Sequence, residues 1–212
     1  MSKRDCVFLV ADTNMETVFK AFLTDPAFPD RLECAAFGFN PAQDLLKAAG
    51  RADPGVYAQA HEYLRSYSVT HRYAVVVLDA EWSGSPGAEQ IREKIQGDLC
   101  RSGWAEGQTE TIVIEPELES WIWVESPQVG RALGWKDATG LREWLEAEGW
   151  WPAGADKPTR PKEAVEAVLE KTGKSRSSAR YGKIVREASI KHCNDPAFRE
   201  LKTVLQRWFP KG

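Results

Sequence analysis

Acidic residues follow three short hydrophobic segments of this sequence. The segments are residues 6–10, 73–78 and 111–114. The acids that come after them are, in order, Asp12 and Glu16, then Asp79 and Glu81, then Glu115, Glu117 and Glu119. Short apolar runs rich in β-branched residues are typical of buried strands. Each group of carboxylates is therefore expected where a buried strand ends in a loop.

Three acidic strand ends predict one acidic pocket that holds a metal ion. In an open parallel α/β sheet the carboxyl ends of the strands form the ligand crevice. Carboxylates crowded there oppose one another's ionisation, and Mg²⁺ or Mn²⁺ prefers their oxygens as ligands. The expected metal ligands are Asp12, Asp79, Glu81, Glu115 and Glu119. The expected catalytic carboxylates are Asp12, Glu16, Asp79 and Glu81. A bound ion would neutralise a phosphodiester and activate water.

A purely structural interpretation of these acids stays open on the sequence alone. Acidic residues often follow strands because helix N-termini favour negative charge. Pro116 indicates the start of a helix directly after the third segment. Some of the three glutamates around it could therefore only complement that helix dipole.

The order of the predicted elements sets the fold class. Ser85 is predicted to cap a helix whose first residue is Pro86. Strands are predicted at about residues 5–11, 32–39, 73–78 and 111–114, and helices between them at about 15–24, 56–66 and 86–101. Such alternation predicts an α/β fold with a mostly parallel four-stranded sheet flanked by helices.

The second half of the chain is predicted to be helical. Helices are expected at about residues 116–124, 127–134, 138–148, 161–172, 176–190 and 196–208. A loop rich in Pro and Gly at 150–161 separates an α/β domain with additional helices, residues 1–149, from a helical C-terminal extension, residues 150–212. The tryptophans concentrated here are Trp121, Trp123, Trp144, Trp150, Trp151 and Trp208. They predict a packing seam between sheet and tail, with stacking on unpaired bases as the alternative.

Basic residues concentrate in the C-terminal extension. They are Lys171, Lys174, Arg176, Arg180, Lys183 and Arg186. The stretch contains Gly-Lys-Ser, but it lacks the upstream glycine of a P-loop and follows a helix, which argues against nucleotide binding there. One interpretation is a solvated helix face. The other is a surface that binds the phosphates of DNA or RNA, which an acidic pocket would itself repel.

Composition limits the remaining classes of protein. The 212 residues are 42% hydrophobic, enough for a core, and the net charge of −3 excludes a generally basic nucleic-acid coat. Cys6 and Cys34 lie in predicted strands and are expected to be buried free thiols, since the cysteines lack zinc spacing. The sequence has no signal-peptide core and no window near the ~18 apolar residues of a membrane span. A cytoplasmic protein without a membrane partner is expected.

Residues 5–120 resemble the Toprim domain of topoisomerases, primases and nucleases of the overcoming-lysogenisation-defect type. Residues 12–16, Asp-Thr-Asn-Met-Glu, are similar to the Glu-Gly-x-Thr-Glu motif of those nucleases, with the same separation of the two acids. Residues 79–81, Asp-Ala-Glu, are similar to their Asp-x-Asp motif. Thr13 stands in place of the motif's Gly, and Glu81 in place of its second Asp. The resemblance implies Mg²⁺-dependent chemistry on nucleic acids.

A second resemblance covers nearly the whole chain and is to small proteins of bacterial methylation-associated anti-phage defence systems. The segments that carry it are residues 10–16, 51–55 (Arg-x-Asp-Pro-Gly) and 114–123. It implies a role in phage defence, with other defence-system proteins as partners. It does not define a mechanism.

These expectations describe a cytoplasmic, Mg²⁺-dependent protein that cleaves phosphodiesters of DNA or RNA in phage defence. The alternative is a non-catalytic, Toprim-like binding or assembly subunit that offers its tryptophan-rich surface to a partner. A third hypothesis is an enzyme that acts on a nucleotide or another phosphorylated small molecule. The metal hypotheses require Asp12, Asp79 and Glu81 to converge on one cleft, bordered by Glu115 or Glu119.

Overall fold

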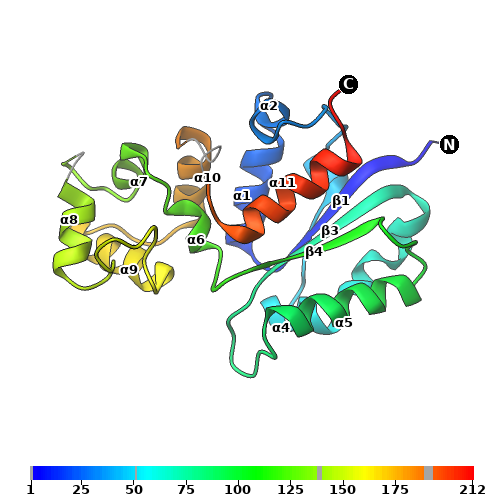
Figure 1. Ribbon diagram of the computed structural model, residues 1–212, viewed down its shortest axis with the longest axis horizontal. Coiled ribbons are helices and arrows are strands. Elements are labelled where there is room, and N and C mark those ends of the chain that lie inside the picture. Colours follow the sequence, from blue (N-terminus) through cyan, green and yellow to red (C-terminus); the bar gives the residue numbers. More distant parts are fainter. Residues whose placement is uncertain (1, 51, 138–139, 189–192) are drawn as a thin grey trace.

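The computed structural model describes residues 2–50, 52–137, 140–188 and 193–212. Within these residues the centre is a sheet of four parallel strands in the order β2-β1-β3-β4 (Figure 1). The strands are β1 (Arg4–Val10), β2 (Leu45–Lys47), β3 (His71–Asp79) and β4 (Thr109–Ile114). The predicted α/β class with a four-stranded parallel sheet is confirmed.

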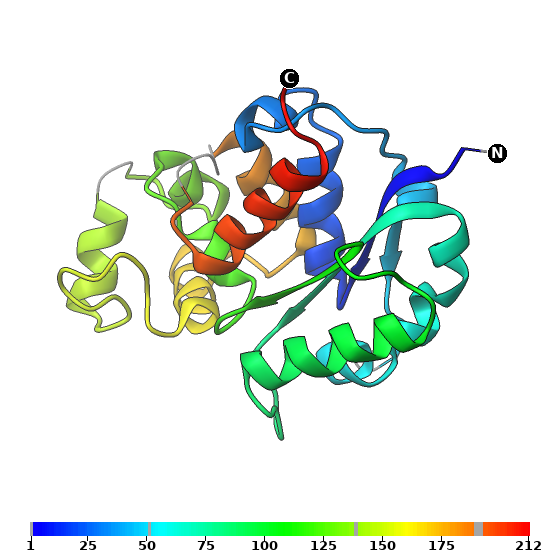
Figure 2. The same ribbon diagram turned by 45° about the vertical axis from the view of Figure 1, so that its right-hand side comes forward.

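Helices cover both faces of this sheet (Figures 1 and 2). On one face lie α4 (Ala52–Leu64) and α5 (Ala88–Arg101), and on the other α1 (Thr13–Leu23) and α11 (Pro196–Trp208). Residues 6–10 of β1 and 74–78 of β3 are 0% exposed. Strands covered on both sides need apolar residues throughout, which is why these segments are continuous hydrophobic runs rather than alternating ones.

The helices between β4 and α11 form a lobe beside the sheet, which we call the helical lobe. It consists of α6 (Glu119–Ile122), α7 (Pro127–Ala132), α8 (Gly140–Ala147), α9 (Pro161–Thr172) and α10 (Ser178–Glu187). The first half of the chain also contains α2 (Phe28–Leu32), α3 (Pro41–Asp44) and η1 (Arg65–Val69). The lobe joins the sheet domain where α10 packs along α1. A Cβ on Gly182 of α10 would lie only 2.9 Å from Cγ2 of Thr17, so a residue without a side chain permits this close approach.

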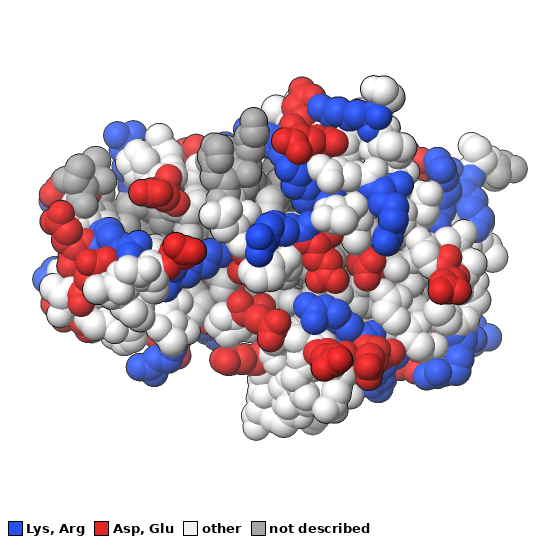
Figure 3. Space-filling model, in the orientation of Figure 1, with Lys and Arg blue, Asp and Glu red and all other residues white. Residues whose placement is uncertain are grey.

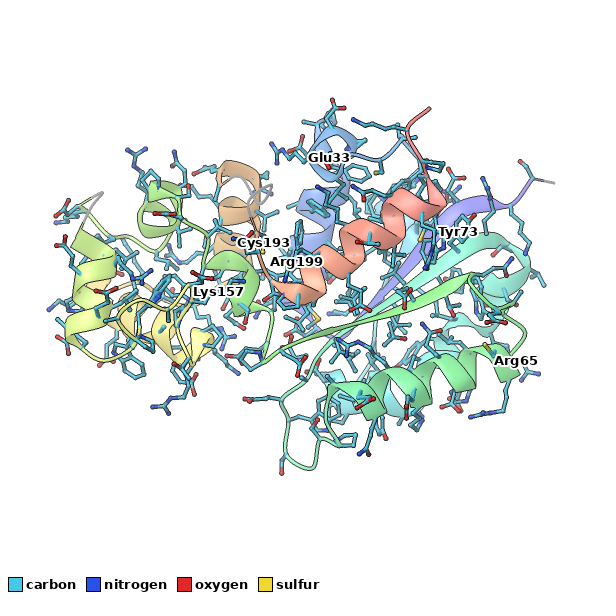
Figure 4. All side chains as sticks on the ribbon, in the orientation of Figure 1. Glu33, Arg65, Tyr73, Lys157, Cys193 and Arg199 are labelled. Carbon is cyan, nitrogen blue, oxygen red and sulfur yellow. The ribbon has the colours of Figure 1, made fainter. Side chains whose placement is uncertain are left out.

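A buried carboxylate connects the helical lobe to α11. Asp195 is 4% exposed and is the N-cap of α11, where it accepts a hydrogen bond from the backbone N of Ala197 at 3.0 Å. It also accepts hydrogen bonds from Nε1 of Trp121 at 3.0 Å and from Nζ of Lys157 at 3.1 Å. Figure 4 shows Lys157, Cys193 and Arg199 close to this junction. The tail is thus bonded into the lobe rather than only packed against it.

The second predicted strand is wrong. Residues 32–39 contain the end of α2 and an extended loop, and the three-residue β2 takes the place beside β1. The aromatic side chains that made this segment resemble a strand pack into the core instead. Phe37 stacks on Phe209 with ring centroids 4.3 Å apart, and Phe39 meets Phe8 at 5.9 Å. The apolar run at residues 32–39 therefore indicates burial, but it does not indicate that the segment pairs with another strand.

Smaller differences concern helix starts and the thiols. Ser85 does not cap α5, which begins after Gly87, because its hydroxyl donates to the carbonyl O of Ala80. The helix predicted from residue 116 begins at Glu119. Cys6 and Cys34 are buried free thiols as predicted, although Cys34 follows α2 and lies outside the strands. The predicted helices at 138–148 and 176–190 include positions that lie outside the described residues. Residue 51, which is part of the segment 51–55, also lies outside them.

The amino-terminal edge of the sheet is held by a buried ionic network. Asp44 is 0% exposed and uses both carboxylate oxygens. It accepts hydrogen bonds from Nε and Nη2 of Arg4, from the backbone N of Asn40 at 2.6 Å and from Nε2 of His71 at 3.1 Å. Burial alone would raise the pKa of Asp44, but these donors outweigh it and lower that pKa below its ordinary value.

We predict that Asp44→Ala lowers the unfolding free energy by about 3–5 kcal/mol, because Arg4 and His71 lose a buried partner. Urea denaturation followed by circular dichroism measures the change. Asp30→Ala is the matched control, since Asp30 is 84% exposed and its carboxylate pairs with Lys211 at 3.0 Å on the surface. That variant should change stability by less than about 1 kcal/mol. Equal losses in the two variants would show that the network does not stabilise this edge.

Candidate functional site

The strand order creates a topological switch point between β1 and β3. After β1 the chain adds β2 on one side, whereas β3 and β4 lie on the other side of β1. Ligand crevices of open parallel sheets lie at the carboxyl ends of the strands at such a point. Asp12 follows β1 and Asp79 ends β3, and the register pairs Val10 with Val77. The structure therefore brings Asp12 and Asp79 to the same edge from neighbouring strands.

Two acids that the site prediction omitted join them. Asp53 lies in the first turn of α4, and its Oδ1 accepts a hydrogen bond from the backbone N of Asp79 at 2.9 Å. Glu117 lies in the turn after β4, and its Oε1 accepts from the backbone N of Lys162 at 2.9 Å. These bonds connect α4 to β3 and the β4 turn to the start of α9. These hydrogen bonds thus hold segments that are far apart in the sequence around one cluster of acidic residues.

Glu119 completes this group from the first turn of α6. It is 3% exposed, and two side chains of the helical lobe donate to its Oε1. The hydroxyl of Tyr181 lies 2.6 Å from that oxygen and Nη2 of Arg176 lies 2.8 Å from it. We call the set Asp12, Asp53, Asp79, Glu117 and Glu119 the acidic edge. Figure 3 shows acidic side chains, with basic ones beside them, on the surface between the helical lobe and α5, whereas Glu119 itself is buried.

Burial and mutual repulsion make ionisation difficult at the acidic edge. Burial raises the pKa of Asp79 well above its ordinary value, and the charges of Asp53, Glu119, Asp12 and Glu117 raise it further. The pKa of Asp53 is also raised, again mainly by burial.

Glu117 titrates in the neutral range for the same reasons. Burial, followed by the charge of Glu119, raises the pKa of Glu117 to about 7. Lys162 acts in the opposite direction, because its positive charge lowers the pKa of both Glu117 and Asp53. Positive charge from the start of α9 therefore offsets part of the repulsion at the acidic edge.

Each acid of the edge has one oxygen fixed by a donor. Asp12 Oδ1 accepts from the backbone N of Met15 at 2.8 Å and caps α1, and Asp79 Oδ1 accepts from the backbone N of Leu118 at 2.8 Å. Asp53, Glu117 and Glu119 are held through Oδ1, Oε1 and Oε1 respectively. Among the described residues, the hydrogen bonds of Asp12, Asp79, Glu117 and Glu119 fall on this one oxygen, whereas Asp53 also accepts from its own backbone N. These donors therefore fix how each carboxylate is oriented.

This donor set suits a hard divalent cation but needs side-chain adjustment to bind one. Carboxylate oxygens are the preferred ligands of Mg²⁺. The raised pKa values of Asp79 and Glu117 reflect repulsion between neighbouring carboxylates, which a bound cation would relieve. In the part of the chain that the structure describes, no three His, Cys, Asp or Glu side chains are already placed as a metal-binding group. The acidic edge is therefore a set of oriented carboxylates rather than a finished coordination sphere.

The structure places the other predicted acids apart from this set. Oε2 of Glu16 lies 3.9 Å from Nζ of Lys47, on the β2 side of β1. Glu81 and Glu115 line a shallow hollow of about 580 Å³ together with Trp82 and the start of the loop from β3 to α5, which projects from the sheet in Figure 2. The backbone N atoms of Ala80 and Glu81 donate to the carbonyl O of Pro116, so this loop is tied to the turn after β4.

The predicted basic stretch does not form one free surface. Arg176 points inward to Glu119, and Arg180 donates to the carbonyl O atoms of Ser175 and Ala132. Lys171 lies over the ring of Trp144 at 5.8 Å, and Nζ of Lys183 lies 3.9 Å from Glu187. Lys174 packs beside Gly134, and Arg186 lies beside Gly182. Several of these cations therefore stabilise the lobe, which favours the structural interpretation for part of the stretch.

Four of the six tryptophans likewise pack inside the protein, whereas Trp144 and Trp150 are half-buried. Trp121, Trp123, Trp151 and Trp208 are each less than 10% exposed. Trp208 stacks on Tyr73 with centroids 4.5 Å apart, and Trp123 meets Trp151 edge-on at 5.5 Å. This supports the packing seam between sheet and tail over stacking on bases.

Two of the residues that the sequence prediction omitted, Asp53 and Lys162, lie at helix starts rather than strand ends. Asp53 precedes Pro54 at the start of α4, and Lys162 follows Pro161 at the start of α9. Helix starts usually carry polar residues for local reasons, so neither position points to a site. Only the parallel topology, which brings helix N-termini to the carboxyl edge of the sheet, identifies them.

Comparison of the chain with protein-family models, curated proteins and solved structures finds no match. What the acidic edge can do is therefore inferred from its own residues and contacts. Among the described helices, none has the length and apolar character needed to cross a bilayer.

We predict that Glu117→Gln flattens the pH dependence of stability. The folded pKa of Glu117, about 7, exceeds its ordinary 4.5. Its protonated form therefore adds stability that is fully present below about pH 4.5 and is lost as the pH rises through 7. The glutamine cannot ionise, yet its Oε1 still accepts from Lys162. Stability should match the wild type at pH 4 and exceed it at pH 8 by about 1–2 kcal/mol, allowing for solvent screening.

Urea denaturation at a series of pH values measures this difference. Glu170→Gln, on the exposed side of α9, is the control and should track the wild type throughout. A Glu117→Gln protein whose stability falls between pH 4 and pH 8 as steeply as the wild type would contradict the assignment of this titration to Glu117.

Proposed function

We propose that this chain uses the acidic edge to bind a divalent cation and to process phosphodiesters of DNA or RNA in bacterial anti-phage defence. The observation that supports the proposal best is the set of five carboxylates at the topological switch point, each with one oxygen held by a donor. A donor on one oxygen of a carboxylate fixes the orientation of the whole group. In this proposal the other oxygen of that carboxylate is left to bind the cation. The defence role rests on the sequence resemblance to methylation-associated systems.

Asp12, Asp79 and Glu119 are the residues that would hold the cation. Mg²⁺ bound there would neutralise phosphodiester charge and activate water. Asp53 holds the backbone of Asp79 in place and adds negative charge, while Lys162 keeps a positive charge beside the carboxylates. Each residue thus either offers an oxygen or positions a neighbour that does.

The second candidate function is a non-catalytic binding or assembly subunit with the same fold. One observation favours it: Arg176 and Tyr181 satisfy Glu119 internally, as in a structural ion pair. Under this hypothesis the carboxylates serve only to hold the helical lobe against the sheet. A metal-binding measurement separates the two functions, because a structural network has no need of a cation.

Asp79→Asn is the decisive variant for the proposed function. The asparagine Oδ1 can still accept from Leu118, so the fold should persist while one charge is removed. Mg²⁺-dependent cleavage of labelled DNA or RNA should fall by more than about 100-fold, since even outer-shell changes at metal sites cost tenfold to about 100-fold in affinity or activity. Without metal at pH 8, the melting temperature should rise by roughly 2–4 °C, which corresponds to about 1 kcal/mol for a chain of this size.

Glu106→Gln is the control, because Glu106 is an exposed carboxylate in the loop before β4. It should leave both cleavage and melting temperature unchanged. An Asp79→Asn protein that keeps full cleavage or full defence activity would contradict catalysis at the acidic edge and favour the binding subunit.

A further inference from the structure

Arg176 belongs to the connector between α9 and α10, yet it reaches the buried acidic edge. The connector, residues 173–177, is exposed and lies outside both helices. Nη2 of Arg176 donates to Glu119, and Nη1 donates to Oε1 of Glu166 on α9 at 3.0 Å. The side chain is 36% exposed, so part of the guanidinium faces solvent. Among the six predicted phosphate-binding cations, it is the one paired with the acidic edge in the described structure.

The Arg176–Glu119 pair is chemically exchangeable. Glu119 receives Arg176 and Tyr181 on the same oxygen, so Tyr181 would keep one hydrogen bond to Glu119 if Arg176 left. A guanidinium matches a phosphate as well as a carboxylate, because its planar N–H groups form paired hydrogen bonds with either. A cation that binds Glu119 would weaken the attraction of that carboxylate for Arg176. The guanidinium could then swing to a phosphate beside the acidic edge while the exposed connector moves with it.

We propose that Arg176 is the substrate-phosphate ligand of the acidic edge, and that it exchanges Glu119 for a phosphate of the DNA or RNA backbone when a divalent cation binds. This inference rests on the proposed function and adds a residue role to it. The proposal also requires that binding of the cation and binding of the polynucleotide are thermodynamically coupled. If the cation and Arg176 compete for Glu119, and Arg176 binds the phosphate, then the cation and the polynucleotide must strengthen each other's binding by the same factor.

The first measurement is Mg²⁺ affinity by isothermal titration calorimetry without nucleic acid. Arg176→Gln removes the competing cation and should tighten Mg²⁺ binding by about tenfold, within the 5–150-fold typical of coupled sites. Arg176→Lys should lie between the variant and the wild type. Arg101→Gln is the matched control, because Arg101 pairs with Asp98 on the surface of α5 and is 73% exposed. It removes the same charge and should leave Mg²⁺ affinity within about twofold.

The second measurement is binding of a phosphorothioate oligonucleotide by fluorescence anisotropy, with Ca²⁺ in place of Mg²⁺, across a salt series. Arg176→Gln should weaken binding and reduce the salt slope by about one unit, the value for one lost phosphate contact. Arg101→Gln should change neither quantity. Wild-type protein should also bind the oligonucleotide more tightly with Ca²⁺ than without it, and Arg176→Gln should lose most of that gain.

Each outcome has a distinct meaning. Wild-type protein that binds no Mg²⁺ would overturn the proposed function together with this inference. Metal binding that tightens in Arg176→Gln with unchanged oligonucleotide binding would show that Arg176 is only a counter-ion, and would overturn the inference alone. The same holds if Arg176→Gln leaves Mg²⁺ affinity equal to that of Arg101→Gln. Circular dichroism of Arg176→Lys and Arg176→Gln establishes that both variants are folded before either comparison is made.

Discussion

Repulsion between carboxylates at the switch point is the constraint around which this protein is built. Asp12 and Asp79 leave neighbouring strands at one edge, and Asp53 bonds to the backbone of Asp79. Their charges oppose one another in a partly buried setting, which the raised pKa of Asp79 reports. The fold accepts this cost at the edge where open parallel sheets bind ligands. Purely structural needs would be met more easily by apolar residues, since buried charges contribute little net stability.

The helical C-terminal extension is part of this site. Lys162 from the start of α9 acts on Asp53 and Glu117, while Arg176 from the α9–α10 connector and Tyr181 from α10 hold Glu119. The composition break at residues 150–161 therefore does not separate a site from a detachable basic tail. The extension supplies the positive charge that lets the acids lie together, and α11 then returns to cover the sheet.

The sequence predicts this site where its signals are local, and it fails where they are not. The apolar runs of β1 and β3 must be buried on both faces, so the positions of Asp12 and Asp79 follow directly. β2 has only three residues, too few to stand out beside the aromatic segment that contains Phe37. Lys162 lies 83 positions after Asp79 in the chain, and no spacing rule connects them. Only the tertiary topology brings such distant residues close together.

Two aspartates at opposite edges of the sheet, buried Asp44 and half-buried Asp79, are held in different ways. Asp44 has donors on both oxygens, including a paired guanidinium, and its pKa is lowered. Asp79 has a donor on one oxygen and four acids around it, and its pKa is raised. A carboxylate that serves stability is satisfied within the protein. One that is oriented but left partly unsatisfied keeps free energy that an incoming cation can release, and perturbed acids of this kind mark functional sites. The contrast lies within one chain and one sheet, so burial alone does not explain it.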